Sequence, residues 1–410
     1  METVTLNDKL EILLDGSVTT PRGFTAGAVH VGVRTDWDKL DVGIVASEVP
    51  CVAAATYTRN RVPGASLVVS KQHIAAGPVQ AVVANAGCAN AATGKQGMGD
   101  AAEMCRLTAK KLGIDSEAVV VASTGVIGAY LPMGRIGLGI EKIELSADGG
   151  LDFAKAIMTT DTRPKHIAVR HGGWSIGGVV KGVGMIHPNM ATMLCFVTTD
   201  AAVAQPFLQA SLKEAVDSSF NMIDVDSDTS PDDIALVMAN GLAGGDELHE
   251  LHVGAGAFAA GLKHVCTHLA KAMVADAEGA SKVIQATVTG AASLGDARLA
   301  AREIIRSVGV KTAIYGLDPN WGRILSAIGN SEAAVDEYRT KLSFLGPDGS
   351  EVCVFRDGAP MSYDAAKAKA CLEPRDVMIR VDMGLGEGAA TAWGSDLTEE
   401  FVRLNSVYTT

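Results

Sequence analysis

Short, nearly continuous apolar runs recur along the chain, and stretches with helical spacing lie between them. The runs cover residues 79–85, 118–122, 193–199, 234–238 and 283–288. Runs of this length without alternation predict strands that are buried on both faces. Helices are predicted for the segments 100–112, 151–158, 206–220, 257–276, 296–307 and 365–371. A sheet buried on both faces must be covered by helices or by a second sheet, so we expect a layered fold.

The order of these elements narrows the choice among layered folds. The chain shows no strict alternation of strand and helix, and no Gly-x-Gly-x-x-Gly fingerprint follows a predicted strand. A mixed α/β sandwich is therefore favoured over a dinucleotide-binding fold. The 410 residues allow two or three domains, and neither an internal repeat nor a low-complexity linker marks a boundary.

Composition excludes several classes of function. The net charge of −12 at pH 7 argues against a nucleic-acid partner or an anionic membrane surface. The N-terminal residues lack the basic and apolar regions of a signal peptide, and no apolar stretch reaches the roughly 18 residues of a membrane span. The seven cysteines are scattered, with no C-x-x-C pair, so neither a zinc site nor a disulfide framework is indicated. These features predict a cytoplasmic protein without a metal.

Residues 181–194 read Lys-Gly-Val-Gly-Met-Ile-His-Pro-Asn-Met-Ala-Thr-Met-Leu. Glycine, proline and asparagine mark loops, so the simplest interpretation is a loop that leads into the strand 193–199. A chemical interpretation centres on Thr192, whose hydroxyl is a poor nucleophile without a base. Cleavage between Ala191 and Thr192 would supply that base, because a free α-amine has a pKa of about 7.7–8.0.

This segment resembles the self-cleavage signature of the ornithine acetyltransferase (glutamate N-acetyltransferase) family of arginine biosynthesis. The resemblance extends from about residue 23 to the C-terminus and departs at Val183, where a small serine or alanine is common. It implies a layered α-β-β-α sandwich like that of the ornithine acetyltransferases and self-processing aminopeptidases. It also implies an α chain of residues 1–191 and a β chain of residues 192–410, intertwined in one catalytic unit and assembled as α2β2.

A candidate oxyanion hole lies at the end of the predicted strand 118–122, in the sequence Ser-Thr-Gly at 123–125. A glycine lets a backbone N–H approach a developing oxyanion, and a threonine hydroxyl adds a second donor. A simple turn after a strand gives the same pattern. The resemblance implies that Thr124 and Gly125 form the oxyanion hole beside the nucleophile Thr192.

Two candidate substrate-binding segments precede Thr192. A lone lysine is usually solvated, but Lys181 stands among glycines near the nucleophile. There it can hold a substrate carboxylate and depress the pKa of the new amine by like-charge repulsion. In the segment 158–162, hydroxyls can simply end a helix, whereas the resemblance implies that Thr159, or its neighbour Thr160, contacts substrate.

Two further candidate segments follow Thr192. Asp276 and Glu278 stand at the end of the predicted helix 257–276, where carboxylates oppose the helix dipole unless they are solvated or have a partner. The resemblance implies that Glu278 pairs with the δ-ammonium group of an ornithine-type substrate. The C-terminal residues would ordinarily form a frayed tail, but the resemblance implies that Asn405 and Thr410 return to the substrate site.

The implied activity is a ping-pong transfer of the acetyl group from N2-acetyl-L-ornithine to L-glutamate through an acetylated Thr192. No bound cofactor is implied, although acetyl-CoA can serve as a second acetyl donor. Three alternatives remain open on the residues alone. They are a self-processing aminopeptidase or amidohydrolase that passes the acyl group to water, a paralogous acetyltransferase of secondary metabolism, and a non-enzymatic metabolite-binding protein with an intact bond between Ala191 and Thr192.

Overall fold

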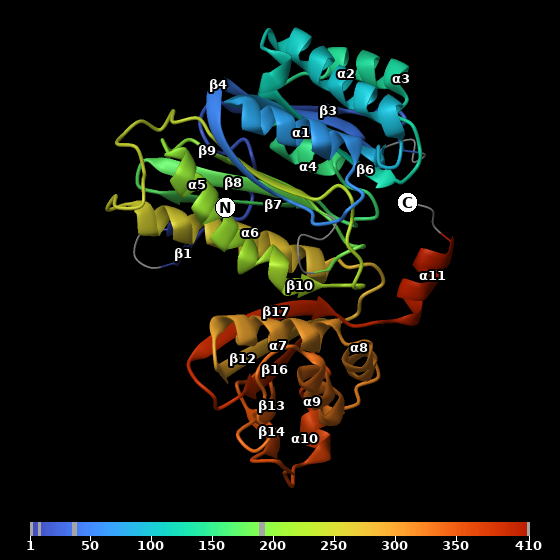
Figure 1. The fold of residues 1–410 in the computed structure, drawn as a ribbon, viewed down its shortest axis with the longest axis vertical. Coiled ribbons are helices and arrows are strands. Elements are labelled where there is room, and N and C mark those ends of the chain that lie inside the picture. The colour runs from blue at the N-terminus through green and yellow to red at the C-terminus, as the bar shows by residue number, and fades with distance from the viewer. Residues whose placement is uncertain (1–2, 7–9, 35–38, 188–192, 408–410) are drawn as a thin grey trace.

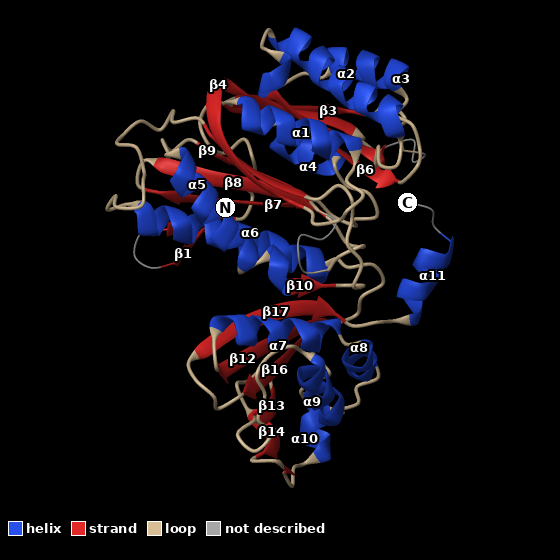
Figure 2. Ribbon diagram, in the orientation of Figure 1, coloured by secondary structure: helices blue, strands red, loops and turns tan. Residues whose placement is uncertain are grey.

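The computed structural model describes residues 3–6, 10–34, 39–187 and 193–407. Ala191, Thr192 and Thr410, three of the predicted site residues, lie outside the described residues. The described strands form a ten-stranded sheet and a seven-stranded sheet, and helices cover both (Figures 1 and 2). The predicted mixed α/β class is therefore confirmed.

The large sheet folds into two layers because one strand belongs to both. Strand β4 (Val42–Tyr57) pairs with β3 and β5 through its first half and with β11 through its second half, and its register shifts between Ala46 and Cys51. The strand order is β1-β2-β7-β8-β9-β11-β4-β5-β6, with β3 beside β4. The other strands are β1 (Thr3–Leu6), β2 (Leu10–Leu13), β3 (Phe24–Val29), β5 (Val79–Cys88), β6 (Val119–Val126), β7 (Lys165–His171), β8 (Trp174–Lys181), β9 (Leu194–Thr199) and β11 (Ile234–Ala239).

Helices close the outer face of each layer. Helices α1 (Ala65–Ala76), α2 (Gly94–Leu112) and α3 (Met133–Lys142) lie over the β3–β6 layer, as the top of Figure 1 shows. Helices α5 (Gln205–Asp217) and α6 (Ala255–Ala275) cover the other layer. The two layers share an apolar interior in which Phe153 of α4 (Gly150–Ala156) packs edge-on against Phe196, with ring centroids 5.5 Å apart. This arrangement is the predicted α-β-β-α sandwich.

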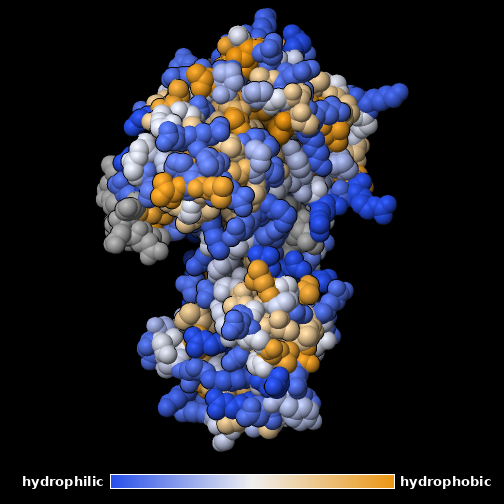
Figure 3. Space-filling model, turned by 60° about the vertical axis from the view of Figure 1, so that its left-hand side comes forward, coloured by the Kyte–Doolittle hydropathy of each residue, from blue (hydrophilic) through white to orange (hydrophobic). Residues whose placement is uncertain are grey.

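The small sheet forms a second body below the sandwich, joined to it by a narrower neck (Figure 3). Its order is β10-β17-β12-β16-β13-β14-β15. These strands are β10 (Ile223–Asp224), β12 (Val283–Ala291), β13 (Lys341–Leu345), β14 (Glu351–Arg356), β15 (Ala359–Pro360), β16 (Asp376–Asp382) and β17 (Gly388–Ser395). The accompanying helices are α7 (Leu294–Arg306), α8 (Val308–Tyr315), α9 (Trp321–Asn330) and α10 (Ala365–Ala370), and α11 (Glu399–Val407) leads back toward the sandwich (Figure 1).

Apart from the two-residue strand β10, the small sheet is built from residues that follow α6, so the sheets do not divide the chain at residue 191. The division into chains 1–191 and 192–410 thus concerns the chemistry of cleavage and stays a prediction. The predicted start of the helix 100–112 is wrong, because α2 already begins at Gly94 and Asp100 lies inside it. Gly113 does end this helix, in the left-handed conformation with φ of 71°.

Candidate active site

Three neighbouring strands bring the predicted site to one edge of the sandwich. Lys181, the last residue of β8, pairs in register with Leu194, the first residue of β9. Leu194 in turn pairs with Ile234, the first residue of β11. The segments that precede β9 and β11 therefore meet beside the end of β8. Met193, the residue that follows Thr192 in the sequence, lies at this edge.

Lys181 is buried, with an exposed fraction of 2%. Its Nζ donates a hydrogen bond to Thr124 Oγ1 over 3.1 Å, which joins two of the predicted site residues. Burial lowers the pKa of the Lys181 ammonium, and the nearby Asp161 carboxylate acts in the opposite direction. The alternative of a solvated surface lysine is thereby excluded.

Gly125 adjoins Thr124 in a position that only glycine can occupy without strain. Strands β5 and β6 run parallel, with Gly87 opposite Gly125. A Cβ atom on Gly125 would lie 2.3 Å from the carbonyl carbon of Gly87, and its φ is 129°. The strand end is held by the Ser123 hydroxyl, which donates to Asn85 Oδ1 over 2.7 Å. Close backbone packing thus fixes the direction of the Gly125 N–H.

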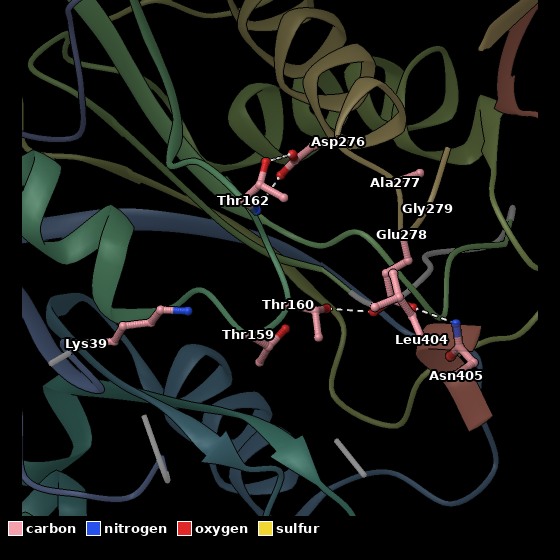
Figure 4. Close-up of a pocket in the computed structure, with 10 residues that line it drawn as sticks. All are labelled: Lys39, Thr159, Thr160, Thr162, Asp276, Ala277, Glu278, Gly279, Leu404 and Asn405. Atoms are coloured by element: carbon pink, nitrogen blue, oxygen red, sulfur yellow. Dashed lines mark hydrogen bonds between the residues drawn. The ribbon is translucent and has the colours of Figure 1, made fainter. Parts of the chain in front are cut away.

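A cavity of about 320 Å³ lies beside this edge and contains several of the predicted substrate-binding residues (Figure 4). Glu278 Oε1 accepts a hydrogen bond from Thr160 Oγ1 over 2.6 Å, and Oε2 accepts one from Asn405 Nδ2 over 2.9 Å. The residues that line the cavity are Lys39, Thr159, Thr160, Thr162, Asp276, Ala277, Glu278, Gly279, Leu404 and Asn405. Segments far apart in the sequence therefore converge on one carboxylate.

Thr159 and Thr160 play different parts in this geometry. Of these two threonines, Thr160 is the one whose hydroxyl donates to Glu278 among the described residues. The Thr159 backbone is fixed instead, because its N–H donates to Asp161 Oδ2 over 3.0 Å and its carbonyl oxygen accepts from Arg34 over 2.8 Å. The Thr159 side chain lines the same cavity, and no hydrogen bond from its hydroxyl is found within the described residues, so both threonines lie at the cavity wall.

A buried ionic cluster supports the wall of the cavity. Lys165 Nζ lies 2.6 Å from Asp161 Oδ1 and 2.7 Å from Asp276 Oδ2. Asp276 also accepts from the Thr162 N–H over 3.0 Å. Although burial raises the pKa of Asp161, the charges of Lys165 and Lys181 outweigh it, and this pKa is lowered. The Asp276 carboxylate at the end of α6 thus has a structural partner.

The sequence did not indicate the cluster around Lys165 or the buried carboxyl group of Asp233. Asp233 Oδ1 accepts a hydrogen bond from the Met193 N–H over 2.9 Å. The one available signal was the unusual run of acidic residues at 224–233. Cys88, the cysteine nearest the candidate oxyanion hole, is buried and donates to the Ala129 carbonyl, and burial raises the pKa of its thiol.

Comparison with known proteins identifies the family. The sequence profile of the ArgJ family matches residues 25–410. The chain belongs to the ArgJ family. A relative from Symbiobacterium thermophilum, named arginine biosynthesis bifunctional protein ArgJ, is 50% identical over 404 residues, which cover 97% of this chain and 99% of the relative. The protein of that name from Bacillus licheniformis is 47% identical over 401 residues, which cover 97% of each chain.

One solved ArgJ structure, the crystal structure from Bacillus halodurans, is 40% identical, covers 52% of this chain and 98% of its own, and gives a TM-score of 0.49. The sequence relatives confirm the resemblance drawn from residues 181–194, and with it the expected class of enzyme, an acyltransferase of arginine biosynthesis. No helix of the described ranges is long and apolar enough to cross a membrane. In the same ranges, no group of three or more side chains is arranged to hold a metal ion.

Proposed function

We propose that this chain is a glutamate N-acetyltransferase that moves the acetyl group of N2-acetyl-L-ornithine to L-glutamate. The observation that carries this proposal is the convergence of Glu278, Thr160 and Asn405 on one cavity beside the buried pair of Lys181 and Thr124. A carboxylate with two neutral donors suits the δ-ammonium of ornithine. A lysine ammonium suits the carboxylate that N2-acetylornithine and glutamate share.

The nucleophile is proposed to arise by self-cleavage. Thr192 Oγ attacks the carbonyl carbon of Ala191, the bond from that carbon to the Thr192 nitrogen breaks, and an ester forms. Water then hydrolyses the ester and releases chains 1–191 and 192–410. The freed α-amine is the base for catalysis, since its ordinary pKa lies close to neutrality.

The transfer then takes place in two half-reactions. The Thr192 amine accepts the hydroxyl proton while Oγ attacks the acetyl carbonyl, and ornithine leaves as the amine. Glutamate binds next, and its amino group takes the acetyl group from Oγ. Because Thr124 Oγ1 accepts its hydrogen bond from Lys181, its own proton is free to donate to the tetrahedral oxyanion, together with the Gly125 N–H.

The finer features of the reaction belong to the same proposal. Thr159, Asn405 and Thr410 are proposed to contact substrate, with Thr159 backed by its rigid main chain. Acetyl-CoA is a second acetyl donor, in keeping with the bifunctional name of the relatives. The working assembly is α2β2, and its proposed location is the cytoplasm, as the composition of the chain favours.

The test compares the wild-type chain with Thr192→Ala. The wild type should yield two chains, one beginning Thr-Met-Leu-Cys, and should form N-acetylglutamate from N2-acetylornithine and glutamate. Thr192→Ala should give one uncut, inactive chain, whereas Thr287→Ala, a half-buried threonine of the small sheet, should be cut and active. A cut or active Thr192→Ala protein would refute the mechanism. Release of acetate without acetylglutamate would favour the hydrolase alternative.

A further inference from the structure

Asp233 lies beside the residue that directly follows the nucleophile. It precedes β11 as Met193 precedes β9, and the two strands are parallel neighbours. Its Oδ1 accepts from the Met193 N–H over 2.9 Å, and the Ile234 N–H donates to the Met193 carbonyl over 3.1 Å. These bonds fix the backbone one residue after Thr192.

The second oxygen of this carboxyl has no such role. Asp233 has an exposed fraction of 0%, and its Oδ2 has no hydrogen-bond partner within the described ranges. Burying an acceptor without a donor is costly, so such groups mark places where a further donor is required. Burial also raises the pKa of Asp233, whereas the Met193 N–H, the nearby Thr58 side chain and the charge of Lys181 act against that rise.

The freed amine of an N-terminal nucleophile needs a fixed acceptor. Its lone pair must face Oγ to receive the hydroxyl proton, so its N–H groups have to be held in other directions. An acceptor anchored to the next residue of the same chain is well placed for this, because the Asp233 carboxyl already bonds the Met193 amide.

We propose that Asp233 is a positioning residue for the nucleophile, holding the Met193 amide through one oxygen and the freed α-amine of Thr192 through the other. This inference rests on the proposed function, because it requires that cleavage exposes the amine. Asp233 does not touch the acetyl group. It acts through the orientation of the base.

The neighbouring Asp232 provides a matched control. It is also buried, with an exposed fraction of 6%, and its Oδ1 likewise has no hydrogen-bond partner within the described part of the chain. However, this oxygen packs against Gly64, where an added Cβ would lie 1.8 Å from it. No bond from Asp232 to Met193 is found among the described residues. Both carboxyl groups are therefore buried and adjacent in the sequence. They differ because Asp233 accepts a hydrogen bond from the Met193 N–H.

The experiment compares Asp233→Asn with Asp232→Asn in the full-length chain. An asparagine at 233 can still accept from the Met193 N–H, but it places a donor where the amine needs an acceptor. We expect Asp233→Asn to be cut but to turn over with kcat lowered about 100-fold and KM close to that of the wild type. Asp232→Asn should be cut and active, and both should keep the wild-type Tm.

If Asp233→Asn matures and turns over as Asp232→Asn does, the inference is wrong. An uncut Thr192→Ala chain in the same series would show that the proposed function still stands. Should Asp233→Asn fold poorly, a crystal structure of the mature wild-type enzyme decides. A separation of about 2.7–3.2 Å between the Thr192 nitrogen and Asp233 Oδ2 supports the inference, and a longer separation overturns it.

Discussion

Replacing Glu278 with glutamine tests the assignment of the ammonium site. The side chain keeps its size and one carbonyl oxygen, so either Thr160 or Asn405 can still donate to it. The negative charge is lost, and the new NH2 group turns a donor toward the other partner. The cavity itself should therefore persist while its attraction for a cation is removed.

The magnitude follows from the partial exposure of Glu278. A hydrogen bond to a charged group contributes about 1.5–3 kcal/mol, and solvent screening favours the lower end at a half-exposed site. A loss of about 1.5 kcal/mol corresponds to roughly a tenfold fall in kcat/KM for N2-acetylornithine. The loss should be expressed mainly in KM, because the δ-ammonium lies far from the acetyl carbonyl.

The assay compares two acetyl donors. N2-acetylornithine carries the δ-ammonium, and N2-acetylnorvaline has the same carbon chain without it. Glu278→Gln should lose activity toward the first donor only, so the two kcat/KM values should converge. Glu399→Gln, which alters an exposed carboxylate on α11 bonded to Tyr315, should change neither value. An equal loss with both donors would show that Glu278 shapes the site and does not bind the ammonium.

Three further predictions concern stability and folding. Lys165→Met leaves two buried carboxylates unpaired and should lower the free energy of unfolding by about 3–5 kcal/mol, measured by urea denaturation. Gly125→Ala should prevent cleavage or folding, because its Cβ meets backbone, and an intact-mass measurement should show one uncut chain. Gly99→Ala on α2 has open space and should give the two wild-type masses. Burial raises the pKa of Asp226 from 3.8 to about 7 in the folded chain. The protonated form therefore stabilises the fold fully below the unfolded pKa, and this contribution is lost as the pH rises through about 7. Urea midpoints at about pH 5 and about pH 8 should differ less in Asp226→Asn than in the wild type, and an unchanged difference would exclude Asp226 as the cause.

The sequence predicted the buried strands better than the helices around them. Runs such as 79–85 and 234–238 are mostly apolar because both faces of the strands are covered, and this pattern is local. Helix α2 was predicted to begin six residues late, because glycines at 94, 97 and 99 have low helix propensity. Contacts override that propensity, since Gly97 packs directly against Thr93 and Asn90.

Site residues that belong to a short sequence motif were predicted. Ion pairs between residues far apart in the sequence were not predicted. Thr124 and Lys181 were both singled out, and the structure joins them. Lys165 and Asp276 were not paired, because they stand 111 residues apart and the position of Asp276 at a helix end does not indicate which residue is its partner. A buried ion pair depends on the path of the whole chain, so neither spacing nor composition could have indicated it.

The charges around the site suggest where positive groups bind during the reaction. Asp161 and Asp276 share Lys165, so their charges are partly balanced within the protein. Within the described ranges, Glu278 and Asp233 are hydrogen-bonded only to neutral donors. The Lys181 charge acts on both carboxyls, but neither forms an ion pair among the described residues, so each gains from a closer positive group. The substrate ammonium would form an ion pair with Glu278, and the amine freed by cleavage would donate a hydrogen bond to Asp233. On this argument, substrate binding and cleavage should each stabilise the fold, and ornithine should raise the Tm of the mature enzyme more than that of the Glu278→Gln protein.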